Sequence, residues 1–452
     1  ARPSPPSGLP GRAGGRDRGG RGRPAPGAVA SPPPRRLGGR GHRPHGRHPR
    51  RWRADHHYHR RRGGRRGRPV DDPGPDLLAG RSVTFDYAVW SFDGNVPGNQ
   101  LLLDDGRVEL EIVEVRGSEI HCVVGYTCEL SDNKGINLRG GGLSAPALTE
   151  KDKEDIKTAA ALDVDYVALS FARSADDVEL CRDYVRKAGC DAGIVTKVER
   201  AEAIENMEAI IEASDVIMVA RGDLGVEMGD AELPALQKSL IKTARSMNRV
   251  VITATQMMES MIENPIPTRA EVFDVANAVL DGTDAVMLSG ETAVGKYPAK
   301  TVAAMGRICE HAEQQRAAMV SDHRLDLVFG RVDEAIAMAT MYTANHLKMN
   351  VIASLTESGS TVLWMSRISS GIPIYALTPN KDTLSRVTLY RGVYPVRIEF
   401  DKIRASQATR DIIELLKSME IVAPGDRMIL TRGDLLGGKG GGSNTMKIVS
   451  VE

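Results

Sequence analysis

The sequence is poor in cysteine and contains no long apolar run. Five cysteines among 452 residues are an odd number, and none forms a C-x-x-C pair. This pattern disfavours a disulfide framework or a zinc knuckle and is typical of a reducing compartment. No apolar run approaches the roughly 18 residues of a membrane span, and no apolar N-terminal segment predicts a signal peptide. We therefore expect a cytoplasmic protein without a membrane partner.

Residues 1–70 lack lysine, isoleucine, phenylalanine and methionine altogether. They contain 20 arginines and 2 acidic residues, whereas the rest of the chain contains 40 basic and 57 acidic residues. The overall net charge of +1 therefore describes neither part. A segment of this composition cannot bury enough apolar surface to offset the entropy of ordering it. We predict a disordered Arg/Gly/Pro-rich tail over residues 1–81.

Three interpretations of this tail remain open. Clustered arginines favour a nucleic-acid-binding arm, but only Trp52 and Tyr58 are available to stack on bases, so nucleic acid is not an expected partner. The residue types are those of GC-rich codons, so a slip of the reading frame would produce the same mixture. The third interpretation is a metal-binding histidine tract, although zinc sites have more defined spacings. Its members would be His42, His45, His48, His56, His57 and His59.

Residues 82–148 predict a small β domain, because short β-like runs alternate there with Asp-Gly and Pro-Gly turns. The runs are Gln100–Leu103, Arg107–Val115 and Ile120–Val124. A helical pattern follows and ends at Ala161, and we expect Thr149 to be its N-cap.

From residue 163 to about residue 315, apolar runs alternate with amphipathic helical stretches. This alternation predicts a parallel sheet covered by helices. Each run ends in polar residues, which is the arrangement of the active face of a TIM barrel. A complete barrel has eight such strands, and only five are found here. The five runs are Asp165–Phe171, Gly193–Val198, Val216–Ala220, Val250–Ala254 and Ala285–Leu288.

Polar residues at the ends of these runs suggest a site for a metal and an anionic substrate. Lys197 and Glu199 point the same way from one strand, and Asp223 follows the next strand. Two carboxylates suit Mg²⁺, and Gly222 and Gly225 allow backbone N–H groups to approach an anion. Lys197 would face a phosphate or a developing enolate. A buried Lys–Glu ion pair remains the alternative, and spacing does not separate phosphoryl transfer from enolate lyase chemistry.

Residues 333–452 predict a second α/β unit, an open doubly wound sheet. Its expected strands are Asn350–Leu355, Pro373–Leu377, Val393–Phe400, Arg427–Thr431 and Thr445–Val451. Its expected helices are Glu334–Leu347, Thr361–Ser369 and Ala408–Met419.

Seven unbroken blocks carry a family resemblance over roughly residues 95–452. They are Leu102-Leu-Asp-Asp-Gly-Arg107, Asn133-Lys-Gly-Ile-Asn137, Ile194-Val-Thr-Lys-Val-Glu-Arg200, Met218-Val-Ala-Arg-Gly-Asp-Leu-Gly-Val-Glu227, Ile252-Thr-Ala-Thr-Gln-Met-Met-Glu-Ser-Met261, Pro267-Thr-Arg-Ala-Glu271 and Asp281-Gly-Thr-Asp-Ala-Val-Met-Leu-Ser-Gly-Glu-Thr292. In these blocks and their order the chain resembles pyruvate kinases, especially bacterial ones.

The resemblance implies a specific architecture. It predicts a (β/α)8 TIM-type barrel over residues 149–325, of which five of eight strands are present. Residues 82–148 would be a small β-barrel lid domain inserted in the barrel, and residues 326–452 a C-terminal doubly wound α/β effector domain. The assembly would be a homotetramer.

The resemblance also implies the reaction, which is transfer of a phosphoryl group from phosphoenolpyruvate to ADP, giving pyruvate and ATP in glycolysis. Catalytic roles fall on Lys197, Thr255, Ser289 and Glu291, with Ser289 and Glu291 near the proton path to the enolate. Lys197, Gly222, Asp223 and Thr255 would bind substrate, and Glu199 and Asp223 would hold Mg²⁺ or Mn²⁺. Asp105 and Lys134 would close over the nucleotide.

The loop between the strand ending at Leu355 and the next helix is a further expected site. Family members bind a phosphorylated small-molecule activator there, and N–H groups and hydroxyls at a helix start suit a phosphate. A plain N-cap is the alternative, and Glu357 makes this copy less basic. The effector-binding residues would be Thr356, Ser358, Gly359, Ser360 and Thr361.

The sequence also departs from the family. Members carry three barrel strands before the lid, with an Asn-x-Ser-His block that helps hold a monovalent cation; these do not occur here, so K⁺ lacks its expected ligands.

Five strands would leave two open sheet edges, so we expect the chain as written to fold poorly and to be inactive. The alternative function is therefore a catalytically dead pyruvate kinase-like fragment. A phosphoenolpyruvate-type lyase is the nearest rival enzyme, and the lid and effector domains argue against it.

Overall fold

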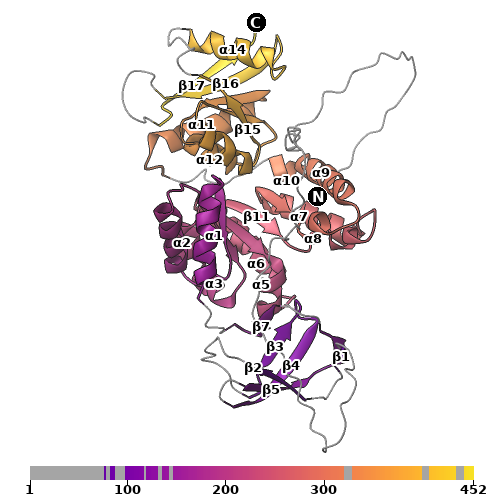
Figure 1. The fold of residues 1–452 in the computed structure, drawn as a ribbon. Coiled ribbons are helices and arrows are strands. Elements are labelled where there is room, and N and C mark those ends of the chain that lie inside the picture. Colours follow the sequence, from indigo (N-terminus) through magenta and orange to yellow (C-terminus); the bar gives the residue numbers. More distant parts are fainter. Residues whose placement is uncertain are drawn as a thin grey trace, which may run out of the picture.

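The computed structural model describes residues 76–77, 82–86, 97–116, 119–130, 135–141, 146–319, 328–399, 407–433 and 442–452. Figure 1 shows a β unit (residues 76–141) at one end of the molecule, a middle unit (146–319) and a C-terminal unit (328–452) at the other end. The predicted tail, residues 1–81, lies outside the described residues except for Asp76–Leu77. These two residues form strand β1, which pairs with β6 (Cys128–Glu129).

The β unit contains a five-stranded antiparallel sheet in the order β2-β5-β4-β3-β7. The turn between β3 and β4 has left-handed backbone, with φ of 52° at Asp104, 57° at Asp105 and 81° at Gly106. Turns of this hand match the twist of a hairpin and favour Asp and Gly. The sheet confirms the predicted β structure. Its strands are β2 (Ser82–Asp86), β3 (Gln100–Leu103), β4 (Val108–Arg116), β5 (Glu119–Val124) and β7 (Ile136–Leu138).

The middle unit is built on a five-stranded parallel sheet in the order β12-β11-β10-β9-β8. Three strands begin and end at the predicted residues, and the two outer strands are shorter than predicted. The strands are β8 (Tyr166–Leu169), β9 (Gly193–Val198), β10 (Val216–Ala220), β11 (Val250–Ala254) and β12 (Ala285–Met287).

Helices connect and cover these strands. The first helix, α1, begins after Thr149 as predicted, because the Thr149 backbone N–H donates to Asp152 Oδ2 at 2.8 Å and the Asp152 N–H donates back to the threonine hydroxyl. The helices are α1 (Glu150–Ala161), α2 (Ala175–Lys187), α3 (Ala201–Glu205), α4 (Met207–Ala213), α5 (Arg221–Met228), α6 (Leu233–Ser246), η1 (Glu259–Ile262), α7 (Arg269–Asp281), α8 (Gly290–Ala293), α9 (Pro298–Glu313) and α10 (Arg316–Met319).

The two faces of the middle sheet are covered differently. Helices α2, α4 and α6 bury the face that carries Ile194, Ile217 and Val251. The opposite face carries Val195 and Met218 with their neighbours, and Leu363, Leu389 and Tyr390 of the C-terminal unit pack against that group. Because side chains alternate along a strand, Lys197 shares the face of Val195. The site at the strand ends therefore opens from this inner face.

The C-terminal unit is a sheet in the order β15-β14-β13-β16-β17, with β17 antiparallel to β16. Apolar clusters lie on both faces, under α11 and α12 on one side and α14 on the other, which confirms the doubly wound arrangement. The sequence did not predict α13, which is only six residues long. The elements are α11 (Val332–Leu347), β13 (Val351–Leu355), α12 (Ser360–Ser366), β14 (Ile374–Thr378), α13 (Lys381–Arg386), η2 (Val387–Leu389), β15 (Val393–Arg397), α14 (Ala408–Ser418), β16 (Arg427–Arg432) and β17 (Thr445–Ser450).

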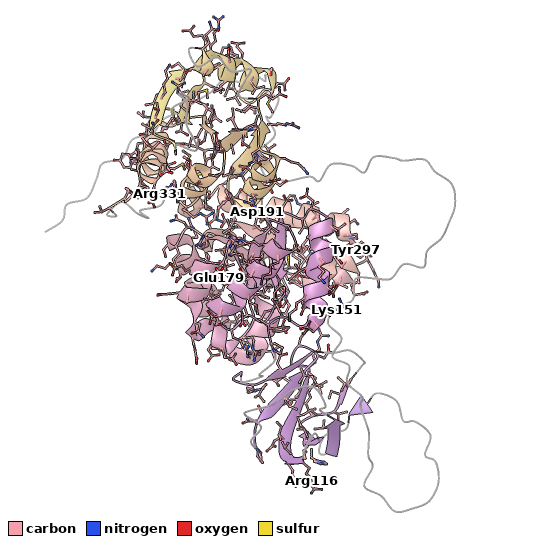
Figure 2. The ribbon with its side chains drawn as sticks, turned by 60° about the vertical axis from the view of Figure 1, so that its left-hand side comes forward. Arg116, Lys151, Glu179, Asp191, Tyr297 and Arg331 are labelled. Carbon is pink, nitrogen blue, oxygen red and sulfur yellow. The ribbon has the colours of Figure 1, made fainter. Side chains whose placement is uncertain are left out.

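The middle and C-terminal units are joined by polar contacts. Asp191 lies where the two units meet (Figure 2), and its carboxylate accepts a hydrogen bond from Arg386 at 2.9 Å. The Tyr166 hydroxyl donates to the Arg386 carbonyl at 3.3 Å. Within the part of the chain that the structure describes, no helix is both long and apolar enough to cross a membrane.

Candidate active site

Lys197 stands at the carboxyl end of β9, where the polar residues of neighbouring strands meet. Its Nζ lies 2.5 Å from Glu199 Oε1 and donates to Ser170 Oγ at 3.0 Å. The lysine side chain is 26 % exposed and the glutamate 1 %. The ammonium therefore faces the accessible side of the site while the carboxylate behind it is buried. Lys197 and Glu199 thus meet Ser170, which follows the neighbouring strand β8.

Glu199, which is buried, and Asp223, which is partly buried, bring two carboxylates close enough to interact electrostatically. Glu199 Oε2 also accepts the backbone N–H of Phe171 at 2.9 Å. Burial, together with the negative charge of Glu199, raises the pKa of Asp223 to about 7, while Lys197 acts in the opposite direction. One lysine near two carboxylates, of which Glu199 is buried and Asp223 partly buried, leaves negative charge that a cation would neutralise.

This donor set fits a hard divalent ion. Among the described residues, no group of three or more His, Cys, Asp and Glu side chains is placed to hold a metal. Mg²⁺ needs no such cage, because it is usually bound through one or two carboxylates plus water and substrate oxygens. Glu199 and Asp223 supply that number, and a bound cation would oppose the two effects that raise the pKa of Asp223, which are burial and the negative charge of Glu199.

Gly222 and Thr255 join the ends of β10 and β11. The Gly222 N–H donates to Thr255 Oγ1 at 2.8 Å, and that hydroxyl donates to the Ala254 carbonyl at 2.6 Å. Thr255 and Gln256 have φ of 66° and 52°, which is an unusual conformation for a β-branched residue and its neighbour. The two groups predicted to bind the same substrate are thus in direct contact.

Ser289 and Glu291 follow β12. Glu291 is buried, and its two oxygens accept backbone N–H groups, from Met258 at 3.1 Å and from Ser289 at 2.7 Å. The carboxylate therefore fixes the loop that follows Thr255 onto the end of β12. Glu291 therefore stabilises the backbone at the ends of β11 and β12. Its position in the sequence did not indicate this role.

The β unit reaches the site through the turn between β3 and β4. Asp105 is exposed there, and its negative charge contributes to the raised pKa of Asp223, so the two carboxylates lie near each other. Arg107 of the same turn donates to Glu259 Oε1 at 3.3 Å across the two units. Lys134, the other predicted lid residue, lies outside the described residues.

The loop between β13 and α12 is held by its own side chains. Thr356 Oγ1 accepts the Gly359 N–H at 2.9 Å, and the hydroxyls of Ser358 and Ser360 lie 2.5 Å apart. Gly359 has φ of 83°, and a Cβ there would lie 2.9 Å from Val387. Thr361 is buried and its hydroxyl contacts Ser443 Oγ at 2.9 Å. The five predicted effector residues thus form one loop at the start of α12. The N-cap residue of α12 is Gly359 and no side chain makes a cap hydrogen bond there, so the loop does not show the Ser/Thr N-cap of the alternative interpretation.

Two buried charged residues beside the site, Arg221 and Glu227, have no role in the sequence-based prediction. Arg221 donates to backbone carbonyls at the end of β11. Glu227 accepts the Ala201 N–H at 3.0 Å and the Asn137 side-chain amide at 3.5 Å, which links α5 to α3 and to the β unit. Arg221 and Glu227 both lie inside one of the sequence blocks that carry the family resemblance, and a charged residue within a largely apolar run was the only signal available.

Comparison with known proteins identifies the family. The model described as "Pyruvate kinase, barrel domain" matches residues 79–302, and the model described as "Pyruvate kinase, alpha/beta domain" matches residues 334–449. The chain belongs to the pyruvate kinase family. The predicted resemblance is confirmed, and so is an α/β fold with a barrel domain and a C-terminal α/β domain.

Curated relatives and a solved structure agree. "Pyruvate kinase II" of Salmonella typhimurium is 57 % identical over 361 residues, 79 % of this chain and 75 % of the relative. "Pyruvate kinase" of Haemophilus influenzae is 54 % identical over 356 residues, 78 % of this chain and 74 % of the relative. The crystal structure of a pyruvate kinase from Cryptosporidium parvum superposes with a TM-score of 0.74 at 31 % identity, covering 83 % of this chain and 80 % of that chain.

These relatives define the function of the chain. It is a phosphotransferase of glycolysis with pyruvate kinase function, and the family implies phosphoenolpyruvate and ADP as substrates. None of the comparisons favours a catalytically dead fragment, and the expectation of an inactive chain therefore lacks support.

Proposed function

We propose that this chain transfers the phosphoryl group at the carboxyl ends of β9, β10 and β11. The observation that carries the proposal is the position of Lys197 Nζ, which contacts both Ser170 and Glu199 and interacts electrostatically with the partly buried carboxylate of Asp223. A fixed positive charge in a partly desolvated pocket stabilises negative charge that develops on a reacting oxygen. Lys197 is the residue of this site that can do so for the phosphoryl group and the enolate.

Glu199 and Asp223 would hold the divalent ion, Mg²⁺ or Mn²⁺. When bound, that ion supplies charge that neutralises the transferring phosphate. Two carboxylates and a raised pKa at Asp223 support this assignment. The requirement for K⁺ stays a proposal from the family alone, because no residue described here is assigned to it.

We assign the substrate carboxylate to Gly222, Asp223 and Thr255. In the structure the Gly222 N–H is bonded to the Thr255 hydroxyl, so an anion that binds both groups has to replace that bond. The N–H groups of Gly222 and Asp223 lie in the first turn of α5, where the helix dipole favours an anion. Ser289 and Glu291 are proposed to lie along the proton path to the enolate, with Glu291 acting through the backbone groups that it holds.

The unit boundaries follow the same proposal. Residues 82–148 would form a lid that closes Asp105 and Lys134 over the nucleotide. Residues 149–325 would form the barrel, with five of its eight strands present. Residues 326–452 would form the effector domain. Contacts between the β3–β4 turn and the middle unit support the lid, since Arg107 reaches Glu259 and Gly106 packs beside Val226. Residues 1–81 would be a separate tail.

We propose that a phosphorylated activator binds the loop from Thr356 to Thr361 and that the assembly is a cytoplasmic homotetramer. The hydroxyl-rich loop supports the first statement. Large exposed apolar side chains on and near α7 and α8 support the second, because such side chains gather where proteins meet. They are Ile266, Phe273 and Val294, which are 71 %, 69 % and 77 % exposed.

Steady-state kinetics of two carboxylate variants test the assignment. Glu199→Gln and Asp223→Asn should each lower kcat/KM by about a hundredfold or more and raise the Mg²⁺ concentration needed for half-maximal rate, since each removes a hard oxygen charge from the site. Glu263→Gln is the matched control, because Glu263 is exposed and pairs with Lys296, which is also exposed, on the middle unit. Unchanged magnesium dependence in both site variants would refute the assignment.

A further inference from the structure

Arg221 lies buried between the ends of β10 and β11, and each of its guanidinium nitrogens has a partner. The side chain is 8 % exposed. Nε donates to the Ala254 carbonyl at 3.2 Å, and Nη2 donates to the Thr255 carbonyl at 2.7 Å and contacts Met257 Sδ at 2.8 Å. Nη1 donates to Asp274 Oδ1 at 2.6 Å and to Gln237 Oε1 at 3.4 Å.

Two of these contacts fix the backbone of Thr255 directly. The carbonyls of Ala254 and Thr255 belong to the peptide groups on either side of the Thr255 Cα. Holding both oxygens with one planar group restricts the rotations that would release Thr255 from its φ of 66°. A β-branched residue leaves this strained region unless the surroundings hold it there.

The same arginine begins the helix that carries the other half of the substrate site. Arg221 is the first residue of α5, and Gly222, whose N–H meets the Thr255 hydroxyl, follows it. One side chain therefore sets the distance between the first turn of α5 and the end of β11. A lysine could not replace it, since an ammonium lacks the planar fork that reaches both carbonyls.

We propose that Arg221 is a positioning residue for substrate binding: it holds Thr255 in its left-handed conformation and so places the Thr255 hydroxyl beside the Gly222 N–H. The inference rests on the proposed function, in which these two groups bind the substrate carboxylate. Arg221 acts through Thr255 and has no contact with the reacting atoms. The ion pair with Asp274 anchors the far side of the guanidinium to α7.

A double-mutant cycle tests this role. Arg221→Lys should raise the KM for phosphoenolpyruvate by about tenfold while changing the KM for ADP by less than twofold. Thr255→Ala should also raise the KM for phosphoenolpyruvate. In the Thr255→Ala background, Arg221→Lys should then change that KM by less than twofold, because residues that act as one unit give non-additive effects. A purely structural arginine would give additive effects on both substrates, and that result would overturn the proposal.

A milder variant covers the case in which Arg221→Lys does not fold. Asp274→Ala removes the anchor of Nη1 from a partly exposed position and should raise the KM for phosphoenolpyruvate about threefold, again only when Thr255 is present. Lys296→Met is the control, because Lys296 and its partner Glu263 are both exposed on the middle unit. If Thr255→Ala leaves the KM for phosphoenolpyruvate unchanged, the assignment of the carboxylate fails. If only the arginine and aspartate variants leave it unchanged, the inference about Arg221 alone fails.

Discussion

Arg367 and Asp284 form a buried ion pair that fastens the C-terminal unit to the middle unit. Arg367 Nη1 donates to Asp284 Oδ2 at 2.9 Å, and both side chains are 1 % exposed. Asp284 also accepts the backbone N–H groups of Val251 at 2.9 Å and Arg391 at 3.0 Å. Arg367 directly follows α12, the helix that begins at the proposed effector loop. Helix α12 and Arg367 thus connect that loop to Asp284, which precedes β12 and accepts a hydrogen bond from β11.

Loss of this pair should destabilise the chain strongly. Arg367→Leu leaves the Asp284 carboxylate buried without its cation, a situation that costs about 3–5 kcal/mol. We expect a fall in Tm of many degrees, measured by calorimetry. Lys381→Met is the matched control, because the Lys381–Asp163 pair also joins the two units but both side chains are more than four-fifths exposed. Equal Tm values for both variants would contradict the importance of the buried pair.

Removing the charge of Lys197 should slow the chemical step. Lys197→Met retains most of the side-chain volume but takes away the positive charge beside Glu199. We expect kcat to fall by about 10²–10³-fold, the usual cost of one preorganised electrostatic contact. Circular dichroism should match that of the unchanged chain. A kcat within threefold of the original would show that the lysine serves only as a structural partner of Glu199.

Metal affinity should depend on pH through Asp223. Its folded pKa of about 7 is raised above that of an ordinary carboxyl, so the group is protonated below this pH, and a metal must displace the proton. Binding of Mg²⁺ without substrate, followed by calorimetry, should therefore strengthen as pH rises from 6 to 8. Asp223→Asn should bind weakly and with no rise across this range. An affinity independent of pH in the original chain would be inconsistent with this assignment.

The same shift has a consequence for stability. Because the folded state holds the proton of Asp223 more tightly than the unfolded state does, this group stabilises the metal-free fold at acidic pH. That contribution is lost as pH rises from the ordinary carboxyl range through about 7. Asp223→Asn should remove this part of the pH dependence of Tm.

Glu227 should control how firmly the β unit is held. Its carboxylate links Asn137 of β7 to the Ala201 N–H that follows β9, and its carbonyl accepts the Gly140 N–H at 3.1 Å. Glu227→Ala breaks the side-chain links, so limited proteolysis should cut residues 82–148 several-fold faster than in the original chain. Glu263→Gln on the outer surface should leave the rate unchanged. Equal cutting rates in all three proteins would argue against this tether.

The sequence predicted the strands better than the contacts between them. Apolar runs gave β9, β10 and β11 to the residue, because strands buried on both faces leave a continuous apolar pattern. Thr149 was predictable as an N-cap, since a cap depends on local residues alone. Helix α13 was missed because six residues are too short to show a helical period.

Some residues of the site were predictable from local sequence, whereas others depend on contacts between distant parts of the chain. Lys197, Glu199 and Asp223 were found because charges at the ends of buried strands stand out. The roles of Arg221 and Glu291 depend on partners 33 to 53 residues away along the chain, such as Ala254, Asp274 and Met258. Such pairings follow from the packing of separate strands and helices, which no local pattern encodes.

Turnover by the purified chain tests the central claim most directly. The 452-residue protein should be incubated with phosphoenolpyruvate, ADP and Mg²⁺, and pyruvate and ATP measured independently. We predict that both products form in equal amounts, that neither forms without ADP, and that a chelator of divalent cations stops the reaction. A folded, monodisperse chain that forms neither product under these conditions would contradict the account and support the catalytically dead alternative.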